Sequence, residues 1–327
     1  MRWPKVEFIR CELHNHTNES DGNLSAEELA AYAAEHNFEV YALTDHNVVS
    51  GQSKVAAAIE KNHYTTQLIK GVEVTTIYGH ILGLGMEDMF DFIELNPYEP
   101  DSFFLNMRAC GAEVIGIAHP FCIGNPIMTG CRYTMELDDY RLIDYIEVYN
   151  TSGGDTELGD RFTGNYDALN WWEDLVHQGY DLAALTGKDL HDVRPEYEEV
   201  FLTYVPVETK ASDKTRQVIN GIKRQETFIT KGPWLTGELR GMKLHLKFDH
   251  RNTYLNWHEV YQDLKPVISV RYSNEEEEIF DITFKSEEVV LPLAKKADRV
   301  TLRIYDKEIS NQSIILAGKV FKQGGHA

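Results

Sequence analysis

Residues 8–16 read Phe-Ile-Arg-Cys-Glu-Leu-His-Asn-His, an apolar, strand-like segment that runs directly into two histidines, His14 and His16. Alternate residues of an extended chain point the same way, so both imidazoles can reach one ion where this strand ends. Imidazole nitrogens are common ligands of zinc and related ions. The segment therefore predicts a buried strand whose carboxyl end carries metal ligands.

The same arrangement recurs along the first 191 residues. Further short apolar runs occupy residues 40–44, 68–75, 80–84, 114–118, 145–149 and 182–186. The potential metal ligands that accompany the runs are His14, His16, Asp21, His46, Glu73, His80, His119, Asp189 and His191. A single histidine is usually a surface or hydrogen-bonded residue, but a series of this kind favours one site that binds more than one metal ion.

Helical patterns separate the apolar runs, so strand and helix alternate through the first two-thirds of the chain. Residues 25–28 (Ser-Ala-Glu-Glu) form a capping box at the start of one helix, and a second helix is expected near 51–61. Ligands at the carboxyl ends of several strands are typical of a (β/α) barrel, whose active site lies on that face. We therefore expect an α/β fold of barrel type over residues 1–236.

The pattern changes after Gly232-Pro233, where polar and apolar residues begin to alternate with a period of two. Such alternation predicts strands that are buried on one side. It covers residues 243–248, 267–272, 279–284 and 300–305. We expect an all-β, sandwich-like domain over residues 237–327. The acidic run Glu275–Glu278 is interpreted as a solvated loop between two of its strands.

Composition and charge argue against several classes of protein. The formal net charge of −20 disfavours binding of duplex nucleic acid, which requires a basic surface. No run of about 18 apolar residues predicts a membrane span, and the first residues read as a strand rather than a signal peptide. We expect a cytoplasmic protein with no membrane partner. Its four cysteines are expected to be reduced, and Cys122, close after His119, has little weight as a ligand.

The ordered motifs, taken together, resemble the polymerase and histidinol phosphatase (PHP) family over roughly residues 7–235. These motifs are His14-Asn15-His16, Ser20-Asp21-Gly22, Thr44-Asp45-His46, Gly71-Val72-Glu73, His80, Ala118-His119-Pro120 and Asp189-Leu190-His191. The resemblance implies a distorted (β/α)7 barrel that holds two or three zinc, manganese or iron ions and hydrolyses phosphoesters. The segments 80–84, 147–150 and 230–233 look like a branch that includes a carbamate-ester hydrolase.

The family motifs also imply a role for each ligand. The first ion would be held by His14, His16, Glu73 and Asp189. A second ion, bridged by Glu73, would be held by His80 and His119. A third would be held by Asp21, His46 and His191. Asp21 departs from family members that have a histidine near this point, and Asp45 is either a buried structural acid or a ligand.

The chemistry implied is ester hydrolysis by activated water, because a water that bridges two ions loses a proton near neutral pH. The residues expected to be catalytic are Glu73, Asp189, His191 and Arg194. Lys188 and Arg161 are further candidates for pairing with an anionic substrate. We expect a phosphoesterase that acts on a small phosphorylated metabolite or nucleotide. The alternatives are a carboxylic or carbamate ester hydrolase and a non-catalytic protein that binds metal or ligand.

Overall fold

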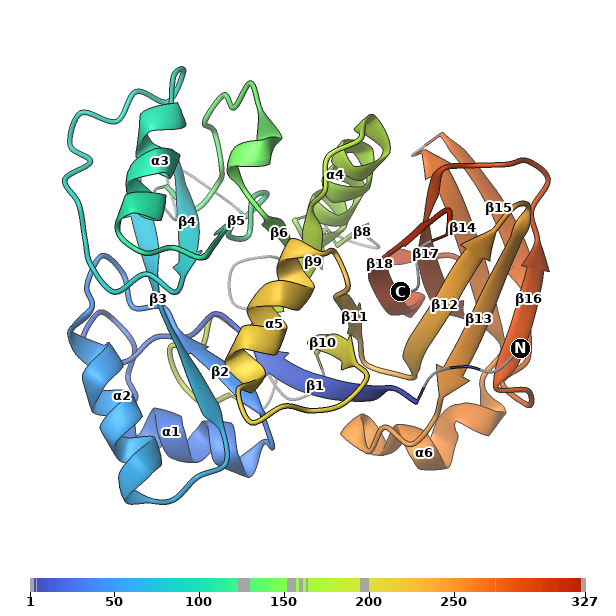
Figure 1. Ribbon diagram of the computed structural model, residues 1–327, viewed down its shortest axis with the longest axis horizontal. Helices are drawn as coiled ribbons and strands as arrows, with labels where there is room; N and C mark the ends of the chain where they lie inside the picture. The colour runs from blue at the N-terminus through green and yellow to red at the C-terminus, as the bar shows by residue number, and fades with distance from the viewer. Residues whose placement is uncertain are drawn as a thin grey trace.

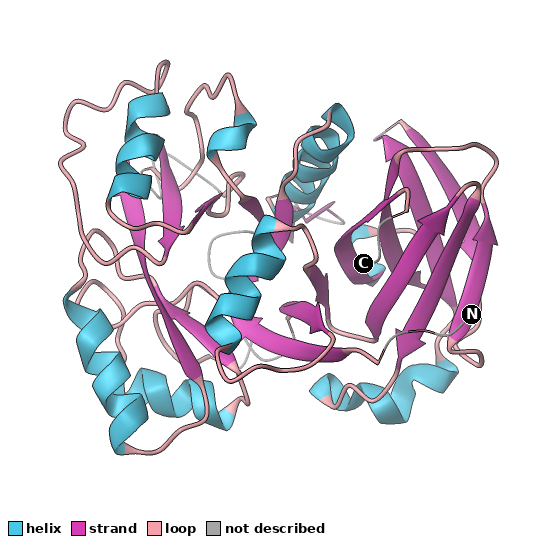
Figure 2. Ribbon diagram, in the orientation of Figure 1, coloured by secondary structure: helices cyan, strands magenta, loops and turns pink. Residues whose placement is uncertain are grey.

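Strand β1 (Glu7–Glu12) lies inside a large sheet, as its run of apolar residues predicts. The structure is a computed structural model that describes residues 3, 5–122, 130–151, 157–158, 161–162, 164–194, 200–273 and 275–324. Figure 1 shows most helices grouped with the N-terminal strands. In Figure 2 the C-terminal part consists mainly of strands. The chain is therefore a mixed α/β protein with a sheet-rich C-terminal region.

Strand and helix alternate in the N-terminal part, as predicted. The elements after β1 are α1 (Ala26–Glu35), β2 (Val40–Leu43), α2 (Ser50–Lys61), β3 (Gln67–Thr76), β4 (Gly79–Leu84), α3 (Asp101–Ala109), β5 (Val114–Ile117), β6 (Tyr145–Asn150), β7 (Glu157–Leu158), β8 (Arg161–Phe162), α4 (Asn165–Gln178), β9 (Ala183–Gly187), β10 (Leu202–Val207), α5 (Lys214–Lys223) and β11 (Phe228–Thr230). The predicted capping box is present, because Ser25 Oγ accepts from Glu28 N and the Glu28 carboxylate accepts from Ser25 N. No helix in the described part of the chain is long and apolar enough to cross a membrane.

The C-terminal region forms two facing layers of strand. Its elements are β12 (Trp234–Arg240), β13 (Lys243–Asp249), α6 (Trp257–Val260), β14 (Pro266–Ser273), β15 (Glu276–Asp281), β16 (Glu288–Pro292), β17 (Arg299–Asp306) and β18 (Ile314–Lys322). Strand β13 buries alternate side chains, Leu244, Leu246 and Phe248, as its period of two predicts. They share one core cluster with Ile268 and Leu302 from the opposite layer. The two layers of strands therefore pack against each other through a common hydrophobic core, as in a sandwich.

One thirteen-stranded sheet connects the two regions, in the order β15-β14-β17-β18-β11-β10-β1-β2-β3-β4-β5-β6-β9. Strands β1, β2 and β3 are parallel to one another, as are β5, β6 and β9. The junction is the antiparallel pair β11 and β18, where Ile229 lies opposite Ala317. The second sheet contains β12, β13 and β16. The predicted boundary at residue 236 falls inside β12, and the division into domains stays a prediction.

The large sheet curls so that its last strand, β9, lies beside β10 and β11. Thr186 N in β9 donates to Thr203 Oγ1 in β10 over 2.9 Å, and Thr227 Oγ1 donates to Ala184 O in β9 over 3.2 Å. Within the described residues, β9 has ladder pairing with β6 alone. The α/β class is confirmed, whereas closure into a seven-stranded barrel stays a prediction.

The acidic run Glu275–Glu278 does not form a loop, because Glu276–Glu278 lie in strand β15. That strand is at the edge of the large sheet, where charged side chains are tolerated since they remain in solvent. Glu277 also pairs with Arg271 on β14 at 3.2 Å. The prediction of a loop was wrong because these pairings across strands cannot be read from a run of like charges.

A buried ion network fastens the C-terminal strands to helix α4. Glu173 on α4 accepts from Arg303 Nε at 3.0 Å and from Arg303 Nη2 at 2.6 Å. Arg271 Nε lies 2.9 Å from the same carboxylate. Both Glu173 and Arg303 are fully buried. Removing one member would leave the other charges desolvated without compensation, which is the costly case for a buried ion pair.

We expect Glu173→Gln to lower the free energy of unfolding by about 3 kcal/mol, because the buried Arg303 would lose its counter-charge and Arg271 would keep only its pair with Glu277. Urea unfolding followed by circular dichroism measures the change. The matched control is Glu276→Gln, which removes a half-exposed pair with Lys295 on the same region and should cause no measurable change. Equal effects of the two substitutions would contradict this role for Glu173.

Candidate metal centre

The nine predicted ligands come together where the strands of the N-terminal part end. His14 and His16 follow β1, His46 follows β2, and Glu73 lies within β3. Ligand atoms approach within 4.8 Å of one another in the groups His14, His16, Glu73 and Asp189; His16, Asp21, His46 and His191; and His46, Glu73 and His80. His119 joins a further group with His80 and Cys131.

Glu73 lies at the centre of this cluster, and its carboxylate is completely buried. Its two oxygens face two different sets of imidazoles. Oε1 lies 2.9 Å from His80 Nδ1 and 3.2 Å from His119 Nε2, whereas Oε2 lies 3.0 Å from His14 Nε2, 3.2 Å from His16 Nε2 and 3.0 Å from His46 Nδ1. A carboxylate placed in this way can contribute one oxygen to each of two neighbouring ions.

The cluster is closed at its base and open on one side. Asp189 Oδ1 lies 3.0 Å from His16 Nε2 deep in the cluster. Asp21 Oδ1 lies 3.2 Å from His191 Nε2 and 3.4 Å from His46 Nε2 on the other side. The side chains of His14, His16 and Glu73 are 0% exposed, whereas Asp21, His46 and His191 are 60%, 20% and 26% exposed. A molecule from solvent therefore meets these last three residues first.

Two buried carboxylates that the sequence analysis missed support His14. Glu147 Oε1 lies 2.9 Å from His14 Nδ1, and its Oε2 accepts from His119 N and from Asn150 Nδ2, each at 2.9 Å. Glu12 Oε1 accepts from His14 N at 3.2 Å. The contact with Glu147 is of the kind that fixes the tautomer and orientation of a ligating imidazole, whereas Glu12 holds the His14 backbone. The available signal was an acid inside an otherwise apolar strand, since Glu147 interrupts the run in β6.

Other ligands are also held from behind. Thr75 Oγ1 lies 2.6 Å from His46 Nδ1, and the Asp189 carbonyl lies 2.8 Å from His191 Nδ1. Asp45 takes no part in the groups of potential ligands. Its carboxylate accepts from Thr17 N at 2.6 Å and from Ser20 Oγ at 2.9 Å. These contacts support the interpretation of Asp45 as a buried structural acid.

Two of the predicted ligands have backbone conformations that residues other than glycine rarely adopt. The φ angle is +26° at His119 and +52° at Asp189, and both residues follow strands that end at the cluster. Such conformations persist only where the surrounding structure imposes them, and they are concentrated at functional sites. Gly187 makes close packing possible here, because a Cβ at this position would overlap the Glu147 carboxylate.

The electrostatics of the cluster favour a bound cation. Burial lowers the pKa of His16, but Asp189 and Glu73 outweigh it and raise this pKa to about 9, and the pKa of His119 also rises to about 9. Burial raises the pKa of Glu73, but the surrounding imidazoles hold it well below its usual range. Among the described residues, His80 Nε2 is buried without a hydrogen-bond partner. This mixed set of nitrogen and oxygen donors fits zinc, manganese or iron.

The structure describes some of the contacts of two predicted cationic residues, Arg194 and Lys188. Arg194 is about half exposed, and its Nε lies 2.6 Å from Asp192 Oδ1. Lys188 is buried, its backbone N–H donates to Glu12 Oε1 over 2.8 Å, and its charge partly offsets the effect of burial, which raises the pKa of Glu12 to about 7. The side chain of Arg161 lies outside the described residues. A role for Arg194 in substrate binding stays a prediction.

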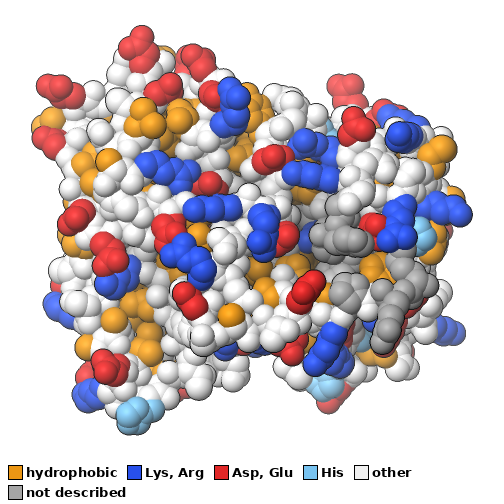
Figure 3. Space-filling view, in the orientation of Figure 1, with side chains coloured by type: hydrophobic (Ala, Val, Ile, Leu, Met, Phe, Trp, Pro, Cys, Tyr) orange, Lys and Arg blue, Asp and Glu red, His pale blue; other side chains and the backbone are white. Residues whose placement is uncertain are grey.

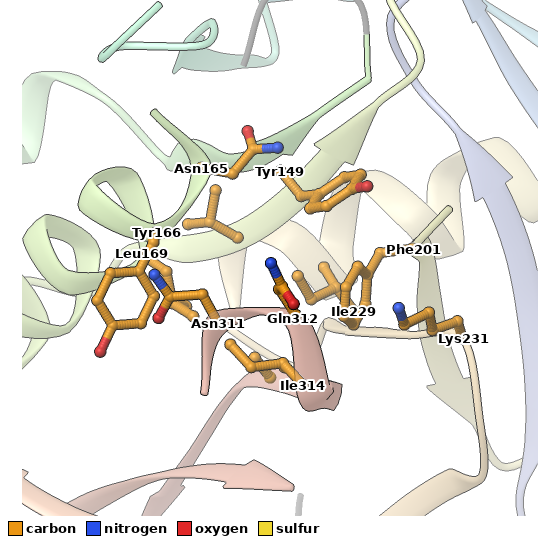
Figure 4. A pocket seen from close by; sticks show the side chains of 12 residues that line it. Tyr149, Asn165, Tyr166, Leu169, Phe201, Ile229, Lys231, Asn311, Gln312 and Ile314 are labelled. Carbon is orange, nitrogen blue, oxygen red and sulfur yellow. The ribbon is translucent and has the colours of Figure 1, made fainter. Parts of the chain in front are cut away.

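A cavity of about 380 Å³ lies between α4, β6, β11 and β18. Figure 4 shows Tyr149 and Lys231 on one side of it and Tyr166 on the other. None of the nine predicted ligands is among its lining residues. One lining residue, Asn165, accepts a hydrogen bond from Asn150 N at the end of β6. The Asn150 side chain in turn donates to Glu147, so a chain of hydrogen bonds leads from the cavity wall to the cluster.

The metal-free and metal-loaded proteins should respond to pH in opposite directions. Protonated His16 and His119 stabilise the metal-free fold fully below their unfolded pKa of 6.5, and this stability is lost as pH rises through about 9. With metal bound, rising pH removes protons that compete for the same nitrogens, so stability should increase. Thermal melting between pH 6.5 and 9, with chelator or with stoichiometric zinc, measures both slopes. Parallel slopes would contradict metal binding by these histidines.

Comparison with known proteins identifies the N-terminal part. Residues 12–149 match the family described as PHP domain. The 5'-3' exoribonuclease Rnm of Escherichia coli strain K12 is 34% identical over 80 residues, which are 23% of this chain and 27% of that protein. The 3',5'-nucleoside bisphosphate phosphatase of Chromobacterium violaceum is 36% identical over 84 residues, 24% of this chain and 29% of that protein. The chain thus spans little more than a quarter of the length of these curated relatives.

One solved structure is similar over nearly the whole chain. It is a two-domain protein from Bacteroides vulgatus, described as containing a predicted PHP-like metal-dependent phosphoesterase, with a TM-score of 0.51 and 14% identity. The likeness covers 98% of this chain and 97% of that one, and it shows a shared fold. The matched segment 12–149 contains seven of the nine residues predicted to bind metal. Residues 12–149 of this chain are therefore a PHP domain, and the family resemblance read from the ordered motifs is confirmed.

Proposed function

We propose that the protein is a metal-dependent phosphoesterase whose reaction centre is the Glu73 cluster. The observation that carries this proposal is the buried Glu73 carboxylate, which lies within 3.2 Å of nitrogens from five imidazoles. So many ionisable groups are rarely buried together unless they are paired or coordinate metal. Two or three divalent ions of zinc, manganese or iron would satisfy them.

Such ions, when bound, supply Lewis acidity toward a phosphoryl oxygen and make water more acidic. The residues of the chain then have positioning tasks. Glu147 holds His14 through Nδ1, which leaves His14 Nε2 directed toward Glu73 and Asp189. Glu73, Asp189 and His191, which the sequence analysis assigned to catalysis, extend from the closed base to the open side. An ester must approach from the side of Asp21, His46 and His191, because these side chains are the accessible ones.

The substrate we propose is a small phosphorylated metabolite or nucleotide. The names of the two curated relatives describe an exoribonuclease and a nucleoside bisphosphate phosphatase, and both reactions cleave phosphate esters of nucleotides. The net charge of −20 argues against duplex nucleic acid, and Figure 3 shows basic side chains interspersed with acidic ones on the face in view. A terminal phosphate on single-stranded RNA is compatible with the relatives' names and belongs in the test.

Arg194 is proposed to pair with the anionic part of the substrate. It lies three residues after His191 in the sequence, and a guanidinium can bind two phosphate oxygens at once. Its ion pair with Asp192 would have to exchange for the substrate. Such a residue contributes to binding more than to the chemical step.

Two alternatives differ from this proposal in testable ways. Hydrolysis of a carboxylic or carbamate ester would use the same cluster on a different bond. The resemblance of segments 80–84, 147–150 and 230–233 to the branch that includes a carbamate-ester hydrolase implies this alternative. A non-catalytic protein would bind metal or a ligand without turnover. Inorganic phosphate discriminates between the first alternative and a phosphoesterase, since it resembles the product of phosphoester cleavage alone.

We expect His14→Ala and Asp189→Ala each to remove most turnover of the responsive substrate, because each loses a donor at the closed base of the cluster. The measurement is a metal-defined assay against phosphomonoesters, phosphodiesters, 5'-phosphorylated single-stranded RNA and carboxyl esters. The control is His258→Ala, which changes a histidine far along the chain with an exposed side chain.

Wild-type protein with bound metal that turns over no ester and binds no phosphate in calorimetry would overturn the enzyme proposal. Turnover of carboxyl or carbamate esters without inhibition by phosphate would support the proposal that the protein is a hydrolase. It would contradict the proposal that its substrate is a phosphoester.

A further inference from the structure

Cys131, which the sequence predicts only to be a reduced cysteine, lies with two of the predicted metal ligands. Cys131 Sγ and one ring nitrogen each of His80 and His119 lie within 4.8 Å of one another, and all three residues are buried. Cys122 follows His119 closely in the sequence, but that spacing gives it little weight as a ligand. The two thiols are neighbours in the fold, since a hydrogen bond joins the side chains of Cys122 and Cys131.

The segment that carries Cys131 is fastened on both sides. Thr134 N donates to Tyr78 O over 2.7 Å, which ties the segment to the turn before His80. Tyr133 N donates to Pro120 O over 3.0 Å, which ties it to the residue after His119. Gly130 has a φ angle of +82°, and a Cβ there would overlap the Thr76 carbonyl. The position of Cys131 between the two histidines is therefore fixed by its neighbours.

Cys131 also orients one of the two histidines. The Cys131 carbonyl lies 3.3 Å from His119 Nδ1, so this nitrogen carries the proton and donates it. The other nitrogen, Nε2, lies 3.2 Å from Glu73 Oε1 and is the one that can bind an ion once its own proton is lost. A carbonyl behind a ligating imidazole is the usual arrangement at protein metal sites. Cys131 thus orients the His119 ring through its carbonyl and places its own sulfur near the ring nitrogens of His80 and His119.

The number of protein ligands available to an ion near His80 and His119 suggests that the Cys131 sulfur is one of them. The group of donor atoms that contains Cys131 otherwise offers an ion the two imidazoles of His80 and His119, and Glu73 is not a member of it. Cys131 therefore adds a third protein donor, of a kind that zinc binds in its tetrahedral sites. Thiolate is a soft ligand that favours zinc, iron or cobalt, whereas manganese prefers oxygen donors. A site with sulfur and a site with imidazole and carboxylate alone would therefore differ in metal preference.

We propose that Cys131 is a thiolate ligand of the ion held between His80 and His119, and that it gives this site a preference for zinc over manganese. The inference rests on the metal centre proposed above. On binding, the thiol proton passes to solvent and the sulfur lone pair forms the bond to the ion. The open side of the cluster, at Asp21, His46 and His191, is left for the substrate.

The test replaces the native ions of the reduced, full-length protein with cobalt and records its near-ultraviolet absorption. A thiolate bound to cobalt gives a charge-transfer band that imidazole and carboxylate ligands do not give. We expect the band in the wild-type protein and in Cys122→Ser, the matched neighbouring thiol, and its loss in Cys131→Ser. X-ray absorption of the zinc form should show a sulfur at about 2.3 Å that disappears in Cys131→Ser alone.

A competition experiment measures the metal preference. Cys131→Ser should lower zinc affinity at this site at least about tenfold, since even an outer partner of a ligand contributes that much. Its manganese affinity should change less. Cobalt bound without a thiolate band, or a band lost in Cys122→Ser but not in Cys131→Ser, would overturn the proposal for Cys131 and leave the metal centre standing. Failure of the wild-type protein to bind cobalt would overturn the metal centre and the Cys131 ligand with it.

Discussion

The burial of the Glu73 carboxylate among imidazoles is the constraint on which the site depends. An ionised carboxylate without solvent requires compensating charge, and the five surrounding histidines can supply it only as protons or by sharing a cation. With protons alone, the cluster would lose the compensation from His16 and His119 as pH rises above their pKa values of about 9. Divalent ions compensate the same carboxylates at neutral pH and leave the imidazoles neutral.

The fold provides this arrangement through its strand ends. Parallel strands β1, β2 and β3 bring His14, His46 and Glu73 to one edge, and the antiparallel turn after β3 returns His80 beside Glu73. The predicted ligands after β5 and β9, His119 and Asp189, have positive φ angles, and their backbone N–H groups donate to Glu147 Oε2 and His14 O. Glu147 and Glu12 then fix His14 from behind. The C-terminal strands extend the same sheet, and the Glu173 network holds them to α4, the helix that leads into β9.

The sequence was sufficient for the features that have a local signal. The spacing of His14 and His16, the apolar runs and the period of two in β13 predicted strands, ligands and the sheet-rich C-terminal region. Features that arise from packing between distant parts of the chain could not be predicted from the sequence. Cys131 lies twelve residues after His119, and nothing in that spacing shows that the chain returns to His80. The acidic run became an edge strand because its partners, such as Arg271, come from a neighbouring strand.

The central claim is that the Glu73 cluster is a multinuclear metal centre. Elemental analysis of the full-length protein, reconstituted with zinc, manganese or iron and freed of loosely bound ions, tests it most directly. The account predicts at least two ions per chain in the wild-type protein and fewer in Glu73→Gln, because an amide cannot bridge two cations as a carboxylate does. Fewer than one ion per chain in the folded wild-type protein would contradict the claim.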